Sequence, residues 1–220
     1  MLADFLTKSV SRPVLSCSLR SLHVVGLGFL ILTKGSADLG LFYASSGDSG
    51  LCAYSDADWG NCKQTRCSIT GFIVSFNNCL IIWKTRKQPT VSLSTAEAKY
   101  KALTDLSTKV LWLRQFVKEL SLCKLDGPTV VFDDNQGCIN TASSDSNSNP
   151  RHMKHVEIQL HFIREVIQNG LIKVVYVPAN KMLVDFMTKS VCRPTLVKCL
   201  EALNVLSLRA RGDVENRAKC

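Results

Sequence analysis

The order of strand-like and helix-like segments restricts the fold of this chain more than any other feature. Three runs rich in β-branched and aromatic residues come first, at 51–55, 71–76 and 80–84. Asn77-Asn78-Cys79 predicts a hairpin turn, and a long helix is expected from Ser94 or Thr95 to about Leu120. Later strands are expected at 129–132 and 171–177, and helices at 135–142, at 156–168 and from near 180. This order predicts an α/β fold, a mixed sheet with helices packed on it.

Composition sets the size of the core and the class of partner. The 220 residues are 46% apolar, enough for one ordinary domain with extensions. The net charge of +9 favours a nucleic acid partner, although a merely soluble basic surface is the alternative reading. Ten cysteines lack any Cys-x-x-Cys pair, so we expect free thiols in a reducing compartment such as cytoplasm or nucleus. The longest apolar run, 24–32, is too short to span a bilayer, so no membrane partner is expected.

A segment near the C-terminus is duplicated at the start of the chain. Met1–Pro13 recurs as Met182–Pro194, and the similarity continues through Leu15/Leu196, Leu19/Leu200, Leu22/Leu203 and Val24/Val205. Two copies at opposite ends do not make a solenoid, whose units pack on their neighbours. We interpret residues 1–25 as sequence debris outside the folded core, with Asp4 a decoy. The alternative is an amphipathic helix that packs on the domain.

Three aspartates carry the chemistry that the sequence suggests. Asp56 ends the first expected strand, Asp134 follows a later strand, and Asp185 begins the last helical region. Carboxylates in such places are far apart in sequence but can converge in an α/β fold. A convergent group of this kind is what a divalent-metal phosphodiester hydrolase needs.

Several motifs, taken together and in order, resemble the ribonuclease H domain at the end of copia-type retrotransposon polyproteins. They are Tyr54-Ser-Asp-Ala-Asp-Trp59, Trp83-Lys-Thr-Arg-Lys-Gln-Pro89, Leu93-Ser-Thr-Ala-Glu-Ala98, Asp134-Asn-Gln136, Lys154-His155, His161-Phe-Ile-Arg-Glu165, Tyr176-Val-Pro178 and Asp185 to Lys189. The resemblance covers about Leu51 to Val191, and residues 33–41 look like the stretch that joins the polymerase to that domain. No polymerase domain is expected in this chain.

The resemblance implies a ribonuclease-H-like fold that cuts the RNA strand of an RNA/DNA hybrid, using two Mg²⁺ ions held by four acidic residues. Asp56 matches the first metal ligand, Asp134 the third and Asp185 the fourth. Together with the duplication, the resemblance predicts four regions: a duplicated motif at 1–25, a connection remnant or linker at 26–50, the ribonuclease-H-like domain at 51–191 and a C-terminal tail at 192–220.

The second acidic ligand is where this chain departs from the family. Relatives usually read Glu-Ala-Glu-Tyr, whereas this chain reads Glu97-Ala98-Lys99-Tyr100. Lys99 falls near the centre of the helix's apolar stripe and Glu97 roughly 150° from it. The stripe comprises Tyr100, Leu103, Leu106, Val110, Leu113, Val117 and Leu120.

Position 99 is therefore the expected ligand position, and a protonated lysine cannot coordinate Mg²⁺. The sequence predicts strongly reduced or absent hydrolysis. The alternative is that Glu97 substitutes through a shifted helix start. The competing function is a catalytically inactive nucleic-acid-binding remnant, and a third is a protein-interaction domain recruited by its host.

Acidic, aromatic and basic residues near the three aspartates are expected to have other roles. Asp133 and Asp58 are expected to be structural or solvated rather than catalytic. Trp59 and Trp83 are expected to pack in the core rather than stack on bases. The candidates for nucleic-acid contact are Lys84, Arg86, Lys87 and His155.

Overall fold

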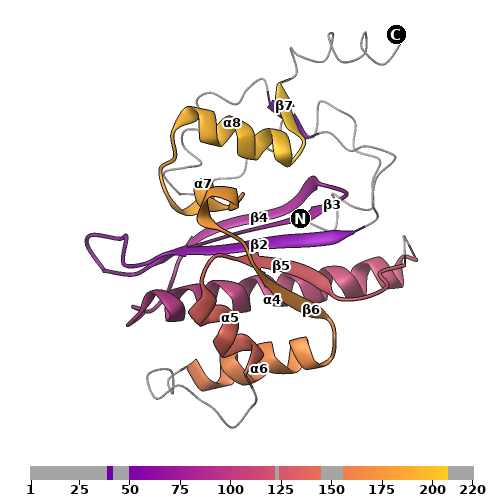
Figure 1. Ribbon diagram of the computed structural model, residues 1–220, viewed down its shortest axis with the longest axis horizontal. Helices are drawn as coiled ribbons and strands as arrows, with labels where there is room; N and C mark the ends of the chain where they lie inside the picture. The colour runs from indigo at the N-terminus through magenta and orange to yellow at the C-terminus, as the bar shows by residue number, and fades with distance from the viewer. Residues whose placement is uncertain (1–38, 42–49, 122–123, 145–155, 208–220) are drawn as a thin grey trace.

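A five-stranded mixed sheet forms the centre of the protein. The structure is a computed structural model that describes residues 39–41, 50–121, 124–144 and 156–207. The strands run in the order β4-β3-β2-β5-β6 (Figure 1). They are β2 (Leu51–Asp58), β3 (Ile69–Phe76), β4 (Cys79–Lys87), β5 (Thr129–Asp133) and β6 (Ile172–Tyr176).

The direction of the strands identifies the fold class. β2, β3 and β4 pair antiparallel, whereas β5 pairs parallel with β2 and β6 pairs parallel with β5. This is the strand order of the ribonuclease-H-like fold, so the predicted fold class is confirmed. The predicted hairpin turn joins β3 to β4, and Asn77 and Asn78 have φ of 51° and 59°. Two positive φ values suit the right-handed twist of a two-residue hairpin.

Three helices cover one face of the sheet. α4 (Thr95–Glu119), α5 (Gln136–Ser143) and α6 (Glu157–Gln168) lie together below the sheet in Figure 1. The apolar stripe of α4 packs against Phe72 and Val74 of β3, and each fully buried large side chain stabilises the fold by about 1.5–3 kcal/mol. The predicted stripe was one residue too long. Leu120 is the C-cap of α4 and remains 47% exposed.

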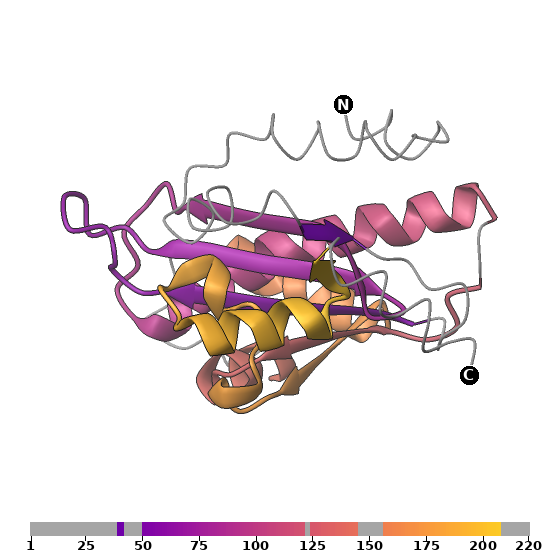
Figure 2. The ribbon, with the colours of Figure 1, turned by 90° about the horizontal axis from the view of Figure 1, so that it is seen from above.

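The opposite face is covered by the segment after β6. A single helix was expected from near residue 180, but the structure has a 3₁₀ turn (Ala179–Lys181), α7 (Asp185–Thr188) and α8 (Arg193–Ala202). Ile73 and Leu80 pack there with Phe186, Leu200 and other apolar residues. Side chains alternate along β3, so Ile73 contacts this layer while its neighbours contact α4. Figure 2 shows α8, in yellow-orange, lying in front of the strands and running in much the same direction.

The packed unit extends beyond the predicted domain limits of 51 and 191. β1 (Leu39–Leu41) pairs antiparallel with β7 (Val205–Ser207), which joins part of the expected linker to part of the expected tail. α8 and β7 belong to the packed unit because Leu200 and Leu203 are buried against the sheet. Residues 1–38 and 208–220 lie outside the described part of the chain.

Two general properties concern membranes and thiols. Of the helices in the described ranges, none is sufficiently long and apolar to cross a membrane. The cysteines that the structure describes are all free thiols: Cys52, Cys62, Cys67, Cys79, Cys138, Cys192 and Cys199.

Candidate functional site

The three predicted aspartates meet at one edge of the sheet. Asp56 lies near the end of β2, Asp134 follows the last residue of β5, and Asp185 is the first residue of α7. β2 and β5 are parallel neighbours, so their carboxyl ends emerge side by side. Asp56 is fully buried, whereas the side chains of Asp134 and Asp185 keep 14% and 20% of their surface.

Lys99, the fifth residue of α4, connects two of these carboxylates. Its Nζ lies 2.7 Å from Oδ1 of Asp56 and also contacts Oδ1 of Asp134. The lysine is only 8% exposed, so the ion pairs are almost entirely removed from water. The helix start that directs Lys99 to this place is set by Ser94, the N-cap, whose hydroxyl accepts the Glu97 N–H at 3.1 Å.

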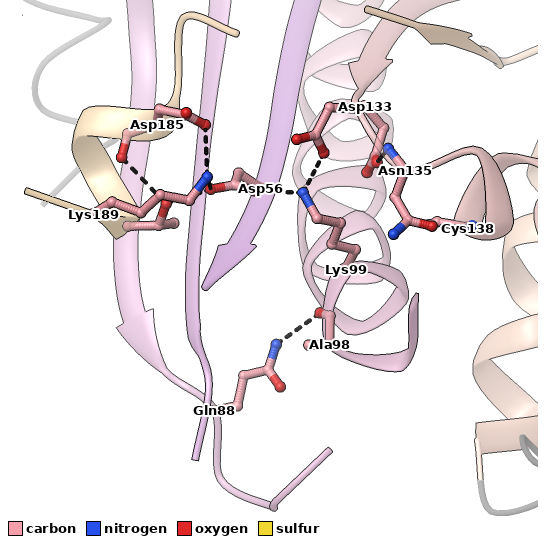
Figure 3. A network of polar contacts seen from close by, with 11 residues as sticks. Asp56, Gln88, Ala98, Lys99, Asp133, Asn135, Cys138, Asp185 and Lys189 are labelled. Atoms are coloured by element: carbon pink, nitrogen blue, oxygen red, sulfur yellow. Dashed lines mark hydrogen bonds and ion pairs between the residues drawn. The ribbon is translucent and has the colours of Figure 1, made fainter. Parts of the chain in front are cut away.

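A second lysine reaches the same carboxylates from the opposite side. Nζ of Lys189 lies 3.2 Å from Oδ1 of Asp185 and 3.5 Å from Oδ2 of Asp56, while the Thr188 hydroxyl donates to Oδ2 of Asp56. Figure 3 shows Lys99 and Lys189 on either side of Asp56. The sequence interpretation did not include Lys189 or Thr188 in the site. The four-residue spacing of Asp185 and Lys189 was the available signal, because such pairs meet on a helix.

Gly71 permits this close approach of α7. It is paired with Asp56 across the β2/β3 ladder. A Cβ at Gly71 would lie 2.5 Å from Cγ2 of Thr188 and 3.0 Å from Cβ of Met187. On the neighbouring strand, the Thr85 hydroxyl donates to the Met187 carbonyl at 2.8 Å and holds α7 in place.

The electrostatics keep the two amines charged and Asp56 ionised. Burial by itself raises the pKa of Asp56, but the ammonium groups of Lys99 and Lys189 outweigh it, so the pKa lies below its ordinary value. Burial likewise lowers the pKa of Lys99, but Asp56 and Asp134 bring the pKa of this amine above its ordinary value. Burial and the nearby Asp56 raise the pKa of Asp185, against the effect of Lys189.

Asp133 is a buried carboxyl next to the site. It is fully buried, and its Oδ1 accepts the Asn135 N–H at 2.8 Å. Burial raises its pKa to about 7, although that backbone hydrogen bond opposes the shift. The solvated alternative is therefore wrong for Asp133. Asp58 is half-buried at the end of β2 and accepts a hydrogen bond from the Asn61 side chain.

Glu97 belongs to the start of α4. The side chain is fully buried, with Oε1 2.7 Å from Nζ of Lys101 and Oε2 accepting the Leu93 N–H at 2.8 Å. Together with the Ser94 cap, this resembles a capping box, in which a serine and a glutamate three residues later satisfy backbone donors at a helix start. Glu97 thus lies against the loop that precedes the helix.

The residues expected to contact nucleic acid differ in their exposure and in their ion pairs. Lys84 and Arg86 pair with Asp105 of α4 at 3.6 and 2.6 Å, Lys87 is exposed, and His155 lies outside the described residues.

The prediction that Trp59 packs in the core is wrong. The residue is 48% exposed, and its indole N–H donates to the Ser92 carbonyl at 2.8 Å, which holds the ring in one orientation.

Comparison with known proteins relates the chain to transposon polyproteins. It is 34% identical over 162 residues to the retrovirus-related Pol polyprotein from transposon RE1 of Arabidopsis thaliana, covering 72% of this chain and 11% of that protein. It is also 34% identical over 160 residues to the polyprotein from transposon TNT 1-94 of Nicotiana tabacum, covering 73% of this chain and 12% of that protein. The chain is a homologue of retrovirus-related Pol polyproteins.

The chain therefore spans about one ninth of the length of these Pol polyproteins, and the predicted relationship to them is confirmed. No protein-family profile matches the chain. Among solved structures, LC11-RNase H1, isolated from compost, has a TM-score of 0.47 and 13% identity, covering 64% of this chain and 96% of that one. The homology shows that the chain descends from a retrotransposon polyprotein, and the strand order shows that its domain has a ribonuclease-H-like fold.

The residues of this Pol homologue do not fit the pair of Mg²⁺ ions that the family resemblance implies. Asp56 faces two ammonium groups, and Asp134 and Asp185 face one each. In the described ranges, no group of three or more His, Cys, Asp or Glu residues has the arrangement of a metal site. Oxygen ligands that Mg²⁺ needs are thus engaged by amines, and the donor set matches an internal salt-bridge cluster rather than a cation site.

Proposed function

We propose that this domain binds nucleic acid, an RNA/DNA hybrid first, without hydrolysing it. The observation that carries the proposal is the ammonium group of Lys99 between Asp56 and Asp134. In the ribonuclease H family this place is expected to hold a metal-binding glutamate. Here a residue of the protein supplies the positive charge, so the charged cluster serves to stabilise the fold.

The charge balance of the cluster supports this proposal. Asp56, Asp134 and Asp185 contribute −3, and Lys99 and Lys189 contribute +2, which leaves −1. A glutamate at position 99 would change this net charge to −3. The carboxylate oxygens would then be available to a divalent cation, and the attraction for that cation would be roughly three times larger at equal distance. The wild-type cluster therefore attracts divalent cations much more weakly, and two-metal hydrolysis depends on binding those cations.

Two features support a nucleic-acid partner for the inactive domain. The chain carries a net charge of +9, which favours binding to phosphates through counterion release. Trp59 presents an exposed aromatic ring held by a hydrogen bond, and nucleobases stack on such rings. Active ribonuclease H chemistry is the second candidate, on family resemblance, but the pairing of every site carboxylate with a lysine does not favour it.

The experiment compares wild type with Lys99→Glu in three measurements. They are cleavage of a labelled RNA/DNA hybrid with Mg²⁺, binding of that hybrid with and without Mg²⁺, and the melting temperature as Mg²⁺ is added. Lys109→Glu is the matched control, because it makes the same charge change at an exposed position of the same helix.

Wild type is expected to bind the hybrid equally with and without Mg²⁺, to leave it uncut, and to show no thermal shift with Mg²⁺. Lys99→Glu is expected to gain Mg²⁺-dependent cleavage and to melt at a higher temperature as Mg²⁺ is added, because ligand binding stabilises the folded state. A wild type that cleaves as fast as Lys99→Glu would overturn the proposal. Failure of wild type to bind hybrid or duplex at low salt would favour a protein-interaction domain instead.

A further inference from the structure

The segment after β6 occupies a defined surface of the sheet, here called the seat. The segment is residues 182–205, the C-terminal copy of the duplicated sequence. It covers Ile73 and Leu80 on the face opposite α4 and approaches Gly71 closely. Its buried side chains are Met182, Val184, Phe186, Met187, Thr188, Cys199, Leu200 and Leu203.

Residues 1–24, the N-terminal copy, keep the pattern that fills the seat. Aligned without gaps, the two copies are identical at 14 of 24 positions. Five of the eight buried residues are identical in the N-terminal copy: Met1, Phe5, Thr7, Leu19 and Leu22. Two more stay apolar, since Ala3 stands for Val184 and Leu6 for Met187. Apolar side chains of about the right size are sufficient for packing.

The differences between the copies fall mostly where the seat does not constrain them. Cys192, Thr195, Val197, Lys198, Glu201 and Ala202 are all exposed in the C-terminal copy and all differ in the N-terminal copy. Change at exposed positions with retention at buried ones is the pattern of a segment that still packs. It does not match debris, in which buried and exposed positions change alike.

The N-terminal copy also carries the polar groups that the C-terminal copy brings to the site. Asp4, Thr7 and Lys8 correspond to Asp185, Thr188 and Lys189. These three residues of the C-terminal copy form the contacts with Asp56 and with one another. A seated N-terminal copy would offer the same carboxylate, hydroxyl and amine to Asp56.

The chain path allows the N-terminal copy to reach the seat of its own chain. Val205, which begins β7, is paired with Leu41 of β1. Its counterpart Val24 precedes β1 by residues 25–38, which is fourteen residues. A connection of that length spans at most about 50 Å, whereas paired strands lie only about 5 Å apart. Val24 can therefore take the place of Val205 beside β1, in the first strand of a hairpin whose second strand is β1.

We propose that the two copies are interchangeable occupants of one seat, and that residues 1–24 replace residues 182–205 on the same chain when the C-terminal copy is weakened. The C-terminal copy is the preferred occupant, because it fills the seat with Val184 where the N-terminal copy has the smaller Ala3. The exchange leaves the polar groups around Asp56 unchanged and releases the residues that follow 205.

The test uses four full-length proteins: wild type, Phe5→Ala, Phe186→Ala and the double variant. Phe186 is 4% exposed, and Phe5 is its counterpart. Hydrogen exchange read by mass spectrometry distinguishes peptides of the two copies by sequence, and the melting temperature reports the whole fold. Ile158→Ala, at a residue that is 87% exposed on α6, is the control.

Phe186→Ala is expected to lower the melting temperature by only a few degrees, while protection appears in residues 1–24 and disappears from residues 182–205. The double variant is expected to melt at least about 10 °C below wild type, because neither copy can then fill the seat. A Phe186→Ala variant that melts as low as the double variant, with unchanged exchange in residues 1–24, would overturn the proposal.

Size-exclusion chromatography identifies which chain supplies the replacing copy. A monomeric Phe186→Ala protein supports exchange within one chain. A dimer would overturn that assignment in favour of a second copy of the chain, since segment exchange between identical chains produces dimers. These readouts do not depend on nucleic-acid binding, so they leave the proposed function untouched whichever way they fall.

Discussion

Replacing Lys99 by methionine tests how much of the fold depends on the charged cluster. Methionine keeps most of the volume and removes the ammonium group. Asp56 is fully buried and Lys99 is 8% exposed, so the two form a buried ion pair. Removing one partner of a buried ion pair costs about 3–5 kcal/mol, because a charge remains without compensation. Lys189 still lies 3.5 Å from Asp56, so we expect about 3 kcal/mol.

The loss should depend on pH in a defined direction. In wild type the pKa of Asp56 is lowered, so its contribution to stability holds above the unfolded pKa and is lost as the pH falls through the folded pKa. Without Lys99, fewer positive groups oppose the effect of burial, so the pKa of Asp56 rises. Protonation of Asp56 then relieves the penalty, so the difference between variant and wild type should shrink as the pH falls from about 7 to about 5.

Urea unfolding followed by tryptophan fluorescence at the two pH values measures this difference. At pH 7 a loss of about 3 kcal/mol corresponds to a melting temperature lower by roughly 6–12 °C for a chain of this size. Lys109→Met, at an exposed position of the same helix, is expected to change stability by less than about 0.5 kcal/mol. A Lys99→Met variant within about 1 kcal/mol of wild type at pH 7, or with an equal loss at both pH values, would refute the reasoning.

Two further variants test neighbours of the cluster. Asp133 has a pKa raised from 3.8 to about 7, so ionising it opposes folding increasingly from about pH 4 and fully above pH 7. Asp133→Asn should therefore stabilise the protein at pH 8 by up to about 4 kcal/mol in urea unfolding, with less gain at pH 5; no gain at pH 8 contradicts this. Trp59→Ala should weaken hybrid binding about tenfold with little change in melting temperature, because the ring is exposed. Trp112→Ala, at another exposed ring, is its control, and equal effects on binding would argue against a role for Trp59.

Local sequence signals were sufficient for the elements and for much of the site. Ser94 begins α4 and Asn135 begins α5, each as an N-cap whose side chain accepts a backbone N–H. The helical period predicted that the side chain at position 99 points toward the sheet. In the structure Lys99 contacts Asp56. These inferences succeeded because capping, turns and periodicity involve residues only a few positions apart.

The misinterpreted residues are those whose surroundings come from distant parts of the chain. Strand alternation at Asp133 did not reveal its burial, which results from the elements packed around the end of β5. Trp59 has an aromatic side chain suited to a core, but the loop that carries Ser92 holds it at the surface. The expected tail became α8 and β7 because Leu200 and Leu203 found an apolar surface on the opposite face of the sheet.

Residue types and their spacing were enough to predict the ancestry of this chain, its mixed sheet and the inward direction of Lys99, which contacts Asp56 and Asp134. Tertiary structure alone determined that a second lysine joins the cluster. The Thr188 hydroxyl reaches Asp56 across 132 positions of sequence, and Lys189 follows it. That approach depends on Gly71, because a Cβ there would collide with Thr188. The contacts of Thr188 and Lys189 with Asp56 result from the packing of α7 on the sheet, whereas the local spacing indicates only the pair of Asp185 with Lys189.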